Sequence, residues 1–299
     1  MMLNVLNITI LYMLKVLIVG ANGQLGNSFL YWSSKFKDFQ FSFTDVPELD
    51  LTKISDIENY LKENLTHYVI NCAAYTNVDN AEFEVQRAEE LNVGVVNNLC
   101  KLSKKYKFRL IHFSTDYVFD GMKNQPYIET DEFSPINVYG KTKAKGESLI
   151  LDSNINAWII RTSWLFSPYG NNFATNIFSK LQEEKKINVV NDQFGSPTYA
   201  IDLAKITLNA IKIERTIEGV KTYHITNEGI SSWYDLALKI KKEINSECHV
   251  NPIKTSRYPN LARRPKYSVL SCDKIKKDFN LDIRSWELGM EHCIRQILY

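Results

Sequence analysis

Tyr139 and Lys143 are spaced so that their side chains could do acid–base chemistry together. They stand four residues apart in the run Tyr139-Gly-Lys-Thr-Lys143, and on a helix this spacing puts both on one face, about a turn apart. An ammonium beside a phenol favours the phenolate and lowers the pKa of the phenol from its usual value near 10. The pair is therefore a candidate proton donor for a carbonyl undergoing reduction. The spacing is common in helices, so its meaning depends on what accompanies it.

A polar cluster follows the apolar run at 109–114. It reads Ser114-Thr115-Asp116-Tyr117, and ligands of open α/β sheets bind at the carboxyl ends of the strands. Thr115 could hydrogen-bond a substrate carbonyl while Tyr139 supplies the proton. Taken singly, Thr115 would be a strand-end hydroxyl and Asp116 a turn-forming carboxylate. Because Thr115 and Asp116 occur together with the Tyr139/Lys143 pair, a catalytic site is the favoured interpretation.

A glycine-rich turn opens the chain's first predicted helix. The run Gly20-Ala-Asn-Gly23-Gln-Leu-Gly26 lies between the apolar segment 16–19 and the helical segment 24–35. Its glycines allow a tight turn, a close approach of the backbone to a pyrophosphate, and close helix–strand packing. The N–H groups at the helix start attract phosphate. The sequence therefore predicts a dinucleotide cofactor, NADH or NADPH.

Two carboxylates compete for the adenosine end of that cofactor. Asp45 follows the second predicted strand, 39–44, with no arginine nearby. It could accept hydrogen bonds from the ribose hydroxyls and repel a 2′-phosphate, which favours NADH over NADPH. Asp50 with Leu51 is the competing candidate, and either carboxylate could instead cap a helix.

The segments that position these residues alternate between strand and helix. Strands are predicted at 16–19, 39–44, 68–74, 109–114 and 158–162, and helices at 24–35, 51–64, 81–106 and 139–151. Such alternation predicts an α/β fold with a Rossmann-type, doubly wound parallel sheet. We expect residues 13–165 to form the NAD(P)-binding domain.

The pattern after residue 165 is less regular. Helices are predicted at 173–184, 201–213 and 231–245, and strands at 187–190 and 223–226. A loop at 257–268 and two further helices follow. We expect the two strands to add to the first sheet. Residues 166–299 would then form mainly a smaller, mixed substrate-binding domain, interleaved with the first.

Composition narrows the class of protein. The 299 residues carry a net charge of +2, which gives no electrostatic reason to expect nucleic acid or a membrane as partner. Five widely spaced cysteines without a Cys-x-x-Cys are typical of reduced thiols in the cytoplasm. The histidines lack metal-ligand spacing, so no metal is expected. The apolar residues 1–12 lack the basic start and cleavage site of a signal peptide, and we interpret them as an N-terminal extension.

Several longer strings carry a resemblance. They are Gly20–Gly26, Cys72–Asp79, Ser114–Gly121, Tyr139–Glu147, Arg161–Phe166, Gly170–Phe173, Asp192–Thr198 and Arg264–Ser268. Through them the chain resembles the extended short-chain dehydrogenase/reductase family, and within it the 4-ketoreductases of nucleotide-linked deoxysugars. The resemblance extends from residue 15 to about residue 270. It implies NAD(P)H-dependent reduction of the C4 ketone of dTDP-4-dehydro-L-rhamnose to dTDP-L-rhamnose.

The resemblance also implies roles for individual residues. Thr115, Tyr139 and Lys143 match the catalytic triad, with Lys143 also orienting the nicotinamide ribose. Trp164 would pack on the sugar ring. Other implied substrate contacts are Val78, Asp116 and Tyr117, and other implied cofactor contacts are Gln24, Leu25, Ala73, Ala74 and Thr76.

The sequence departs from relatives in places and leaves alternatives open. Phe166 stands where many relatives carry tyrosine, and Ala144-Lys145 replaces a more apolar pair. Some relatives form homodimers through a metal held by surface carboxylates. The chain shows no match to these carboxylates, so metal dependence is left open and a homodimer is one candidate assembly. Rival activities are reduction to the other C4 epimer or of a UDP-sugar. A non-catalytic subunit, like the regulatory subunit of methionine adenosyltransferase, is disfavoured by the intact Thr115, Tyr139 and Lys143.

Overall fold

The computed structural model describes residues 13–259 and 261–299. The expected N-terminal extension, residues 1–12, lies outside the described residues.

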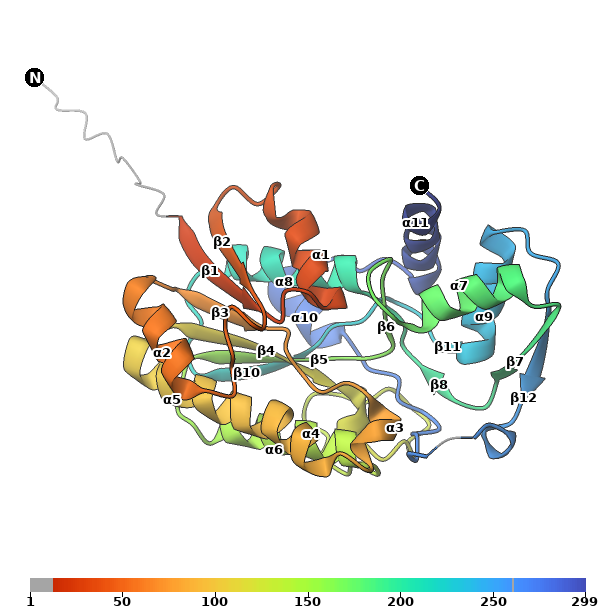
Figure 1. Cartoon of the computed structure of the whole chain (residues 1–299), viewed down its shortest axis with the longest axis horizontal. Coiled ribbons are helices and arrows are strands. Elements are labelled where there is room, and N and C mark those ends of the chain that lie inside the picture. Colours follow the sequence, from red (N-terminus) through yellow and green to blue (C-terminus); the bar gives the residue numbers. More distant parts are fainter. Residues whose placement is uncertain (1–12, 260) are drawn as a thin grey trace, which may run out of the picture.

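Six parallel strands form the central sheet, in the order β10-β5-β4-β3-β1-β2 (Figure 1). They are β1 (Leu14–Val19), β2 (Phe39–Thr44), β3 (Tyr68–Asn71), β4 (Arg109–Thr115), β5 (Ala157–Thr162) and β10 (Val220–His224). Every residue of β3 and β5 is buried, as expected when helices cover both faces. The strand order reverses at β1, between β2 and β3, and sheets of this kind bind ligands at such a point. The predicted Rossmann-type sheet is confirmed.

Helices cover both faces of this sheet (Figure 1). On one face, α1 (Gln24–Ser33), α8 (Ala200–Ile213) and α10 (Asp273–Phe279) share an apolar core with the strands. On the other, α2 (Ile54–Glu63), α5 (Val95–Tyr106) and α6 (Val138–Leu151) do the same. The strands are therefore held in place from two sides, and their carboxyl ends form a fixed platform for a site.

The long helix predicted at 81–106 is confirmed from Val85 to Tyr106, four residues later at its start than predicted. A short α3 (Val78–Ala81) precedes it, and the helix then continues without a break through α4 (Val85–Glu89), the π-helical turn η1 (Glu90–Gly94) and α5. The side chain of Asn92, buried in η1, accepts from Tyr75 N at 2.9 Å and donates to Tyr75 O at 3.1 Å and to Thr142 Oγ1 at 3.0 Å. The π-helical turn thus falls where tertiary hydrogen bonds draw Asn92 toward the loop after β3. β3 itself ends at Asn71, three residues earlier than predicted.

The later part of the chain builds a second, smaller core (Figure 1). There β7 (Lys186–Val190) pairs with β12 (His249–Ile253), and α7 (Phe173–Glu183), α9 (Trp233–Glu243) and α11 (Trp286–Leu298) pack around them. The expectation that 187–190 adds to the main sheet is therefore wrong. β7 alternates exposed and buried residues at its start, so it suits a sheet with one covered face. The segment near 223–226 contributes β10 at the edge of the main sheet.

Two short strand pairs lie between the two cores. β6 (Leu165–Phe166) pairs with β9 (Thr198–Tyr199), and β8 (Phe194–Gly195) pairs with β11 (Ser231–Ser232). None of the helices in the described part of the chain is long and apolar enough to cross a bilayer. The five cysteines carry free thiols.

Candidate active site

The glycine turn has the shape of a dinucleotide cradle. Gly20 has φ +73, and a Cβ there would lie 2.5 Å from the amide nitrogen of Ala73. A Cβ on Gly26 would lie 2.4 Å from the carbonyl oxygen of Ala21. A Cβ on Gly23, in contrast, would come no closer than 3.4 Å to any neighbour. The first and third glycines thus permit packing within the protein, and Gly23 keeps the start of α1 open toward a ligand.

The start of α1 offers uncompensated N–H groups. Gly23 is its N-cap and provides no side-chain hydrogen bond, and the first turn carries no acidic residue. The first amides of a helix, here at Gln24, Leu25 and Gly26, have no intrahelical acceptor. The Gln24 side chain accepts from Ser167 Oγ at 3.1 Å, and Leu25 is buried in the core. These residues fit a pyrophosphate, which would take its hydrogen bonds from the backbone.

Asp45 is tied to the glycine turn. Its Oδ2 accepts from Asn22 N and its Oδ1 from Val46 N, both at 2.9 Å. The carboxylate therefore stands beside the turn at the end of β2, where an adenosine ribose would lie in a fold of this type.

Asp50 and Leu51 are engaged elsewhere. Asp50 Oδ1 accepts from the amide and hydroxyl of Thr52, and Oδ2 lies 3.3 Å from Lys53 Nζ. The hydrogen bonds from Thr52, and more weakly the ammonium of Lys53, hold the pKa of Asp50 below its usual value. Leu51 is buried in the core beneath α2. Asp50 caps a turn and Leu51 fills the core, so Asp45 is the better placed of the two carboxylates to contact the adenosine ribose.

The end of β3 lies against the glycine turn. Ala73 N donates to Asn71 Oδ1 at 3.1 Å, which holds the strand end in place beneath Gly20. Ala73 and Ala74 are half-buried and Thr76 is exposed. Val78 begins α3 and is half-buried. All four thus line the loop between the cofactor cradle and α3, on the carboxyl side of the sheet.

Thr115 and Tyr139 meet across the end of β4. The Thr115 hydroxyl lies beside the Tyr139 phenol and acts to lower its pKa. Thr115 Oγ1 also donates to Asp116 Oδ1 at 3.0 Å and accepts from Tyr117 N at 3.1 Å. The Tyr117 ring lies edge-on to that of Tyr139, with centroids 5.8 Å apart. Four of the predicted residues are therefore brought into one cluster.

The glycine between Tyr139 and Lys143 makes this meeting possible. A Cβ on Gly140 would lie 2.1 Å from Tyr117 O, so α6 could not approach η2 (Asp116–Val118) with any other residue there. Asn137 caps α6 by accepting from Gly140 N at 2.7 Å, and its amide donates to Arg263 O at 2.8 Å. Asn137 thus sets the start of α6, and Gly140 sets the distance between α6 and the end of β4.

The expectation that Lys143 lowers the pKa of Tyr139 is wrong for this arrangement. Burial raises the pKa of Tyr139 to about 12, and the hydrogen bond with Thr115 only partly opposes this. Lys143 Nζ turns instead to β4, where it donates to Phe113 O at 2.6 Å. Burial lowers the pKa of Lys143 to about 8, against the opposing charge of Glu147. Tyr139 is thus protonated over the physiological range, as a proton donor must be.

Asp116 is a buried carboxyl beside the phenol. Burial raises its pKa to about 7, although hydrogen bonds from Ser268 and Thr115 act to lower it. The group is therefore poised between its neutral and ionised forms near neutral pH. Burial also raises the pKa of Tyr117 above its usual value.

Sequence reasoning gave no role to Asp79, Arg264 or Ser268. Arg264 Nη1 and Nη2 lie 3.0 and 2.7 Å from the two oxygens of Asp79, and Ala262 N donates to Asp79 Oδ1 at 2.9 Å. The hydrogen bond from Arg264 holds the pKa of Asp79 below its usual range. Arg264 also hydrogen-bonds Tyr117. The strings that end at Asp79 and begin at Arg264 were visible as motifs, but only the fold shows that they clasp each other.

Trp164 stacks on a second indole. Its ring lies parallel to that of Trp233, with centroids 3.6 Å apart, and Gly195 packs closely against it. Trp164 also has φ +47, a backbone conformation that is uncommon outside glycine and that clusters at functional sites. The contact of Trp164 with the sugar ring stays a prediction. Trp233 is the residue that holds the Trp164 ring in place.

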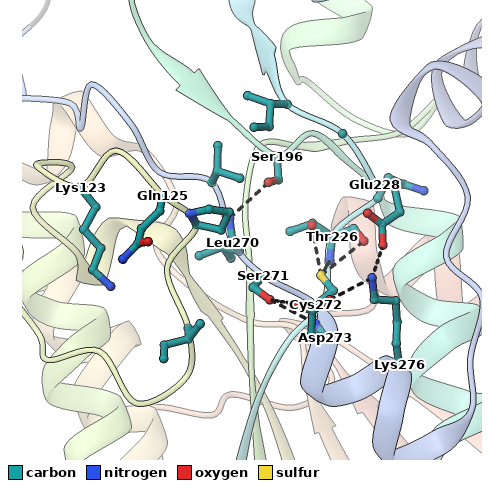
Figure 2. Close-up of a pocket in the computed structure, with 16 residues that line it drawn as sticks. Lys123, Gln125, Ser196, Thr226, Glu228, Leu270, Ser271, Cys272, Asp273 and Lys276 are labelled. Atoms are coloured by element: carbon teal, nitrogen blue, oxygen red, sulfur yellow. Dashed lines mark hydrogen bonds and ion pairs between the residues drawn. The ribbon is translucent and has the colours of Figure 1, made fainter.

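A separate groove of about 530 Å³ lies beside α10, and none of the predicted site residues lines it. Figure 2 shows that Lys276 reaches Glu228 and that the Cys272 thiol hydrogen-bonds Thr226. Burial raises the pKa of Cys272 to about 11, so the thiol is a poor nucleophile. Within residues 13–259 and 261–299, no three His, Cys, Asp or Glu side chains converge as metal ligands would.

A parallel sheet with a glycine cradle at its switch point, and a Thr–Tyr–Lys set at the end of β4 and start of α6, define an extended short-chain dehydrogenase/reductase. The family model described as RmlD substrate binding domain matches residues 14–299. A dTDP-4-dehydrorhamnose reductase of Aggregatibacter actinomycetemcomitans is 38% identical over 94% of this chain and 98% of its own.

Solved structures agree. A dTDP-4-dehydrorhamnose reductase of Bacillus anthracis in complex with NADP is 36% identical with a TM-score of 0.89, covering 94% of this chain and 99% of its own. One from Clostridium acetobutylicum is 36% identical with a TM-score of 0.90, covering 96% and 100%. The chain belongs to the dTDP-4-dehydrorhamnose reductase family.

Proposed function

We propose that the protein reduces the C4 ketone of dTDP-4-dehydro-L-rhamnose to dTDP-L-rhamnose, with NADPH or NADH as reductant. The observation that carries the proposal is the Thr115 hydroxyl beside the Tyr139 phenol at the carboxyl end of β4, on the same edge of the sheet as the glycine cradle. It is supported by membership of the family described above.

Tyr139 acts as the proton donor. Reduction of a ketone develops negative charge on the carbonyl oxygen, and a phenol with a pKa of about 12 retains its proton until that charge appears. Thr115 holds the carbonyl oxygen in line with the phenol. The bound nicotinamide supplies the hydride, while the protein supplies position and electrostatics.

We assign cofactor binding and substrate binding mainly to different parts of the chain. Residues 13–165 with β10 would hold the cofactor through Gly20–Gly26, Asp45, Ala73, Ala74 and Thr76. Residues 166–299 would supply most of the substrate domain. The first part would contribute Trp164 against the sugar, together with Val78, Asp116 and Tyr117. The free thiols suit a reducing compartment, so we place the enzyme in the cytoplasm. A homodimer, the assembly that the resemblance suggests, is proposed as its oligomeric state.

A product assay tests the proposal. The enzyme is incubated with dTDP-4-dehydro-L-rhamnose and either NADH or NADPH, and the product is identified by NMR. We expect oxidation of the cofactor with one sugar product bearing the L-rhamno configuration at C4. Formation of the other C4 epimer, or turnover only with a UDP-linked sugar, would replace this substrate with one of its rivals.

A further inference from the structure

A chain of buried side chains leads from the end of β3 through β4 to Lys143 on α6. Asn71 and His112 are paired neighbours in the parallel register of these two strands, and each is 1% exposed. Asn71 Nδ2 lies 3.1 Å from His112 Nδ1, and His112 Nε2 lies 3.3 Å from Lys143 Nζ. None of these contacts is explained by the roles assigned so far to the active site.

The direction of each hydrogen bond in this series of side chains follows from the contact of Asn71 with the backbone of Ala73. The amide of Ala73 can only donate, so the atom of Asn71 that faces it, at 3.1 Å, is the carbonyl oxygen. The amide nitrogen of Asn71 therefore faces His112 and donates to Nδ1. A neutral imidazole whose Nδ1 accepts carries its proton on Nε2. His112 thus presents an N–H to Lys143.

This N–H affects the balance between the charged and neutral forms of Lys143. It repels an ammonium, which can only donate, but it can donate to the lone pair of a neutral amine. Burial and the neighbouring Lys143 hold the pKa of His112 well below its usual value, so the ring stays neutral. Burial of Lys143 acts in the same sense and lowers its own pKa to about 8.

The remaining titratable groups around this centre are accounted for. On α6 they are Tyr139 and Glu147, and Glu147 is held by Arg161 of β5 in a buried ion pair of 2.9 Å. On η2 they are Asp116 and Tyr117. The charged side chains that α3, α4, η1 and α5 carry are exposed or paired away from Lys143: Asp79 with Arg264, Glu89 with Lys145, and Lys105 with Glu58.

We propose that His112, oriented by Asn71, is a positioning residue that sets the protonation equilibrium of Lys143 and links it to the strand end where the cofactor binds. The proposal deepens the proposed function and rests on it for its kinetic consequence. Lys143 in the ammonium form would donate hydrogen bonds that orient the nicotinamide ribose, so activity falls as Lys143 loses its proton. The alkaline limb of the kcat/KM profile then reports the pKa of Lys143.

The first test reads the tautomer without any substrate. Nitrogen-15 NMR of histidine-labelled full-length protein should show His112 neutral with its proton on Nε2. In Asn71→Asp a carboxylate replaces the donor, so the proton should move to Nδ1 and Nε2 should accept from Lys143. A wild-type ring with its proton on Nδ1 would overturn the proposal whatever the enzyme's substrate.

The second test reads the pH profile. Asn71→Asp should shift the alkaline limb of kcat/KM upward by about one to two pH units. The new carboxylate could act on Lys143 directly, so the same substitution is made in a His112→Phe background. We expect less than about half of the shift there, because the effect passes through the ring.

Equal shifts in both backgrounds, or no shift in either, would refute the coupling. If the NMR result holds while no 4-keto sugar is reduced, the proposed function fails and the assigned tautomer stands. Matching near-ultraviolet circular dichroism of the variants confirms that each has folded.

Discussion

The hydroxyl of Thr115 lies beside the phenol of Tyr139 at the junction of β4 and α6, close enough to act on the pKa of the phenol. Neither residue can be placed by its own element alone, because one ends a strand and the other begins a helix after a long connection. Gly140 brings them together by letting α6 approach the backbone of Tyr117. The site therefore depends on a contact between α6 and η2 that leaves no room for a side chain at Gly140.

Removing the proton donor should stop the chemistry and leave cofactor binding intact. We expect Tyr139→Phe to lower kcat by about 10²–10⁴-fold, the usual contribution of a positioned acid. The dissociation constant of NADH, measured by fluorescence titration, should change little. The matched control is Tyr169→Phe, a half-buried tyrosine outside the cluster. Turnover close to wild type in Tyr139→Phe would exclude it as the donor.

Substitutions at two glycines of the cradle should have different effects, one on the stability of the fold and the other on cofactor affinity. Gly26→Ala should lower the free energy of unfolding by about 1–3 kcal/mol, because its Cβ would overlap the Ala21 backbone. Gly23→Ala should unfold like the wild type but bind NADH about tenfold more weakly, since its Cβ would enter the space left for the pyrophosphate.

Gly94→Ala is the control for Gly23→Ala, because a Cβ at Gly94 also meets nothing closer than 3.9 Å and lies away from the cradle. Unfolding midpoints and NADH titrations measure both properties. Unchanged NADH affinity in Gly23→Ala would show that the phosphates lie elsewhere.

The buried Asp116 should make stability depend on pH. Its folded pKa of about 7 lies above the unfolded value of 3.8, so the folded state holds the proton more tightly. Stability should therefore be unaffected below about pH 4, fall as pH rises to about 7, and then level off. Asp116→Asn should remove this loss, worth on the order of 2–4 kcal/mol. Urea unfolding of both proteins from pH 4 to 8 measures it; parallel curves would contradict the raised pKa.

The Asp79–Arg264 clasp should affect the sugar more than the cofactor. Asp79→Asn removes one charge of a doubly hydrogen-bonded pair and loosens the segment that carries Ala262 and Arg264. We expect KM for the sugar to rise by about 5–30-fold, from a loss of ~1–2 kcal/mol. Glu89→Gln, which breaks the exposed pair with Lys145, should change nothing. Equal effects of the two variants in steady-state kinetics would rule the clasp out.

Asp45 should influence the choice between the two reductants. A carboxylate beside the adenosine ribose repels a 2′-phosphate, so Asp45→Ser should raise kcat/KM for NADPH relative to NADH by about tenfold. Asp50→Ser is the matched control, because Asp50 is engaged by Thr52 and Lys53. If Asp50→Ser changed the ratio and Asp45→Ser did not, the adenosine end would lie at Asp50.

The sequence by itself determined the class of fold and the parts of the site that are contiguous. Alternating apolar and amphipathic segments predicted the parallel sheet, because buried strands and their covering helices have different periodicities. The Gly20–Gly26 turn and the Tyr139/Lys143 spacing were visible because each motif lies within one turn of chain.

Only the tertiary structure decided what depends on distant segments. It put a π-helical turn at Asn92 in the predicted helix, placed 187–190 in its own small sheet, and brought Lys143 Nζ to His112 and Phe113 O. Burial then raised the pKa of Tyr139, although local spacing had predicted a decrease. Hydration and hydrogen-bond partners come from segments far apart in the chain, so no local pattern could have specified them.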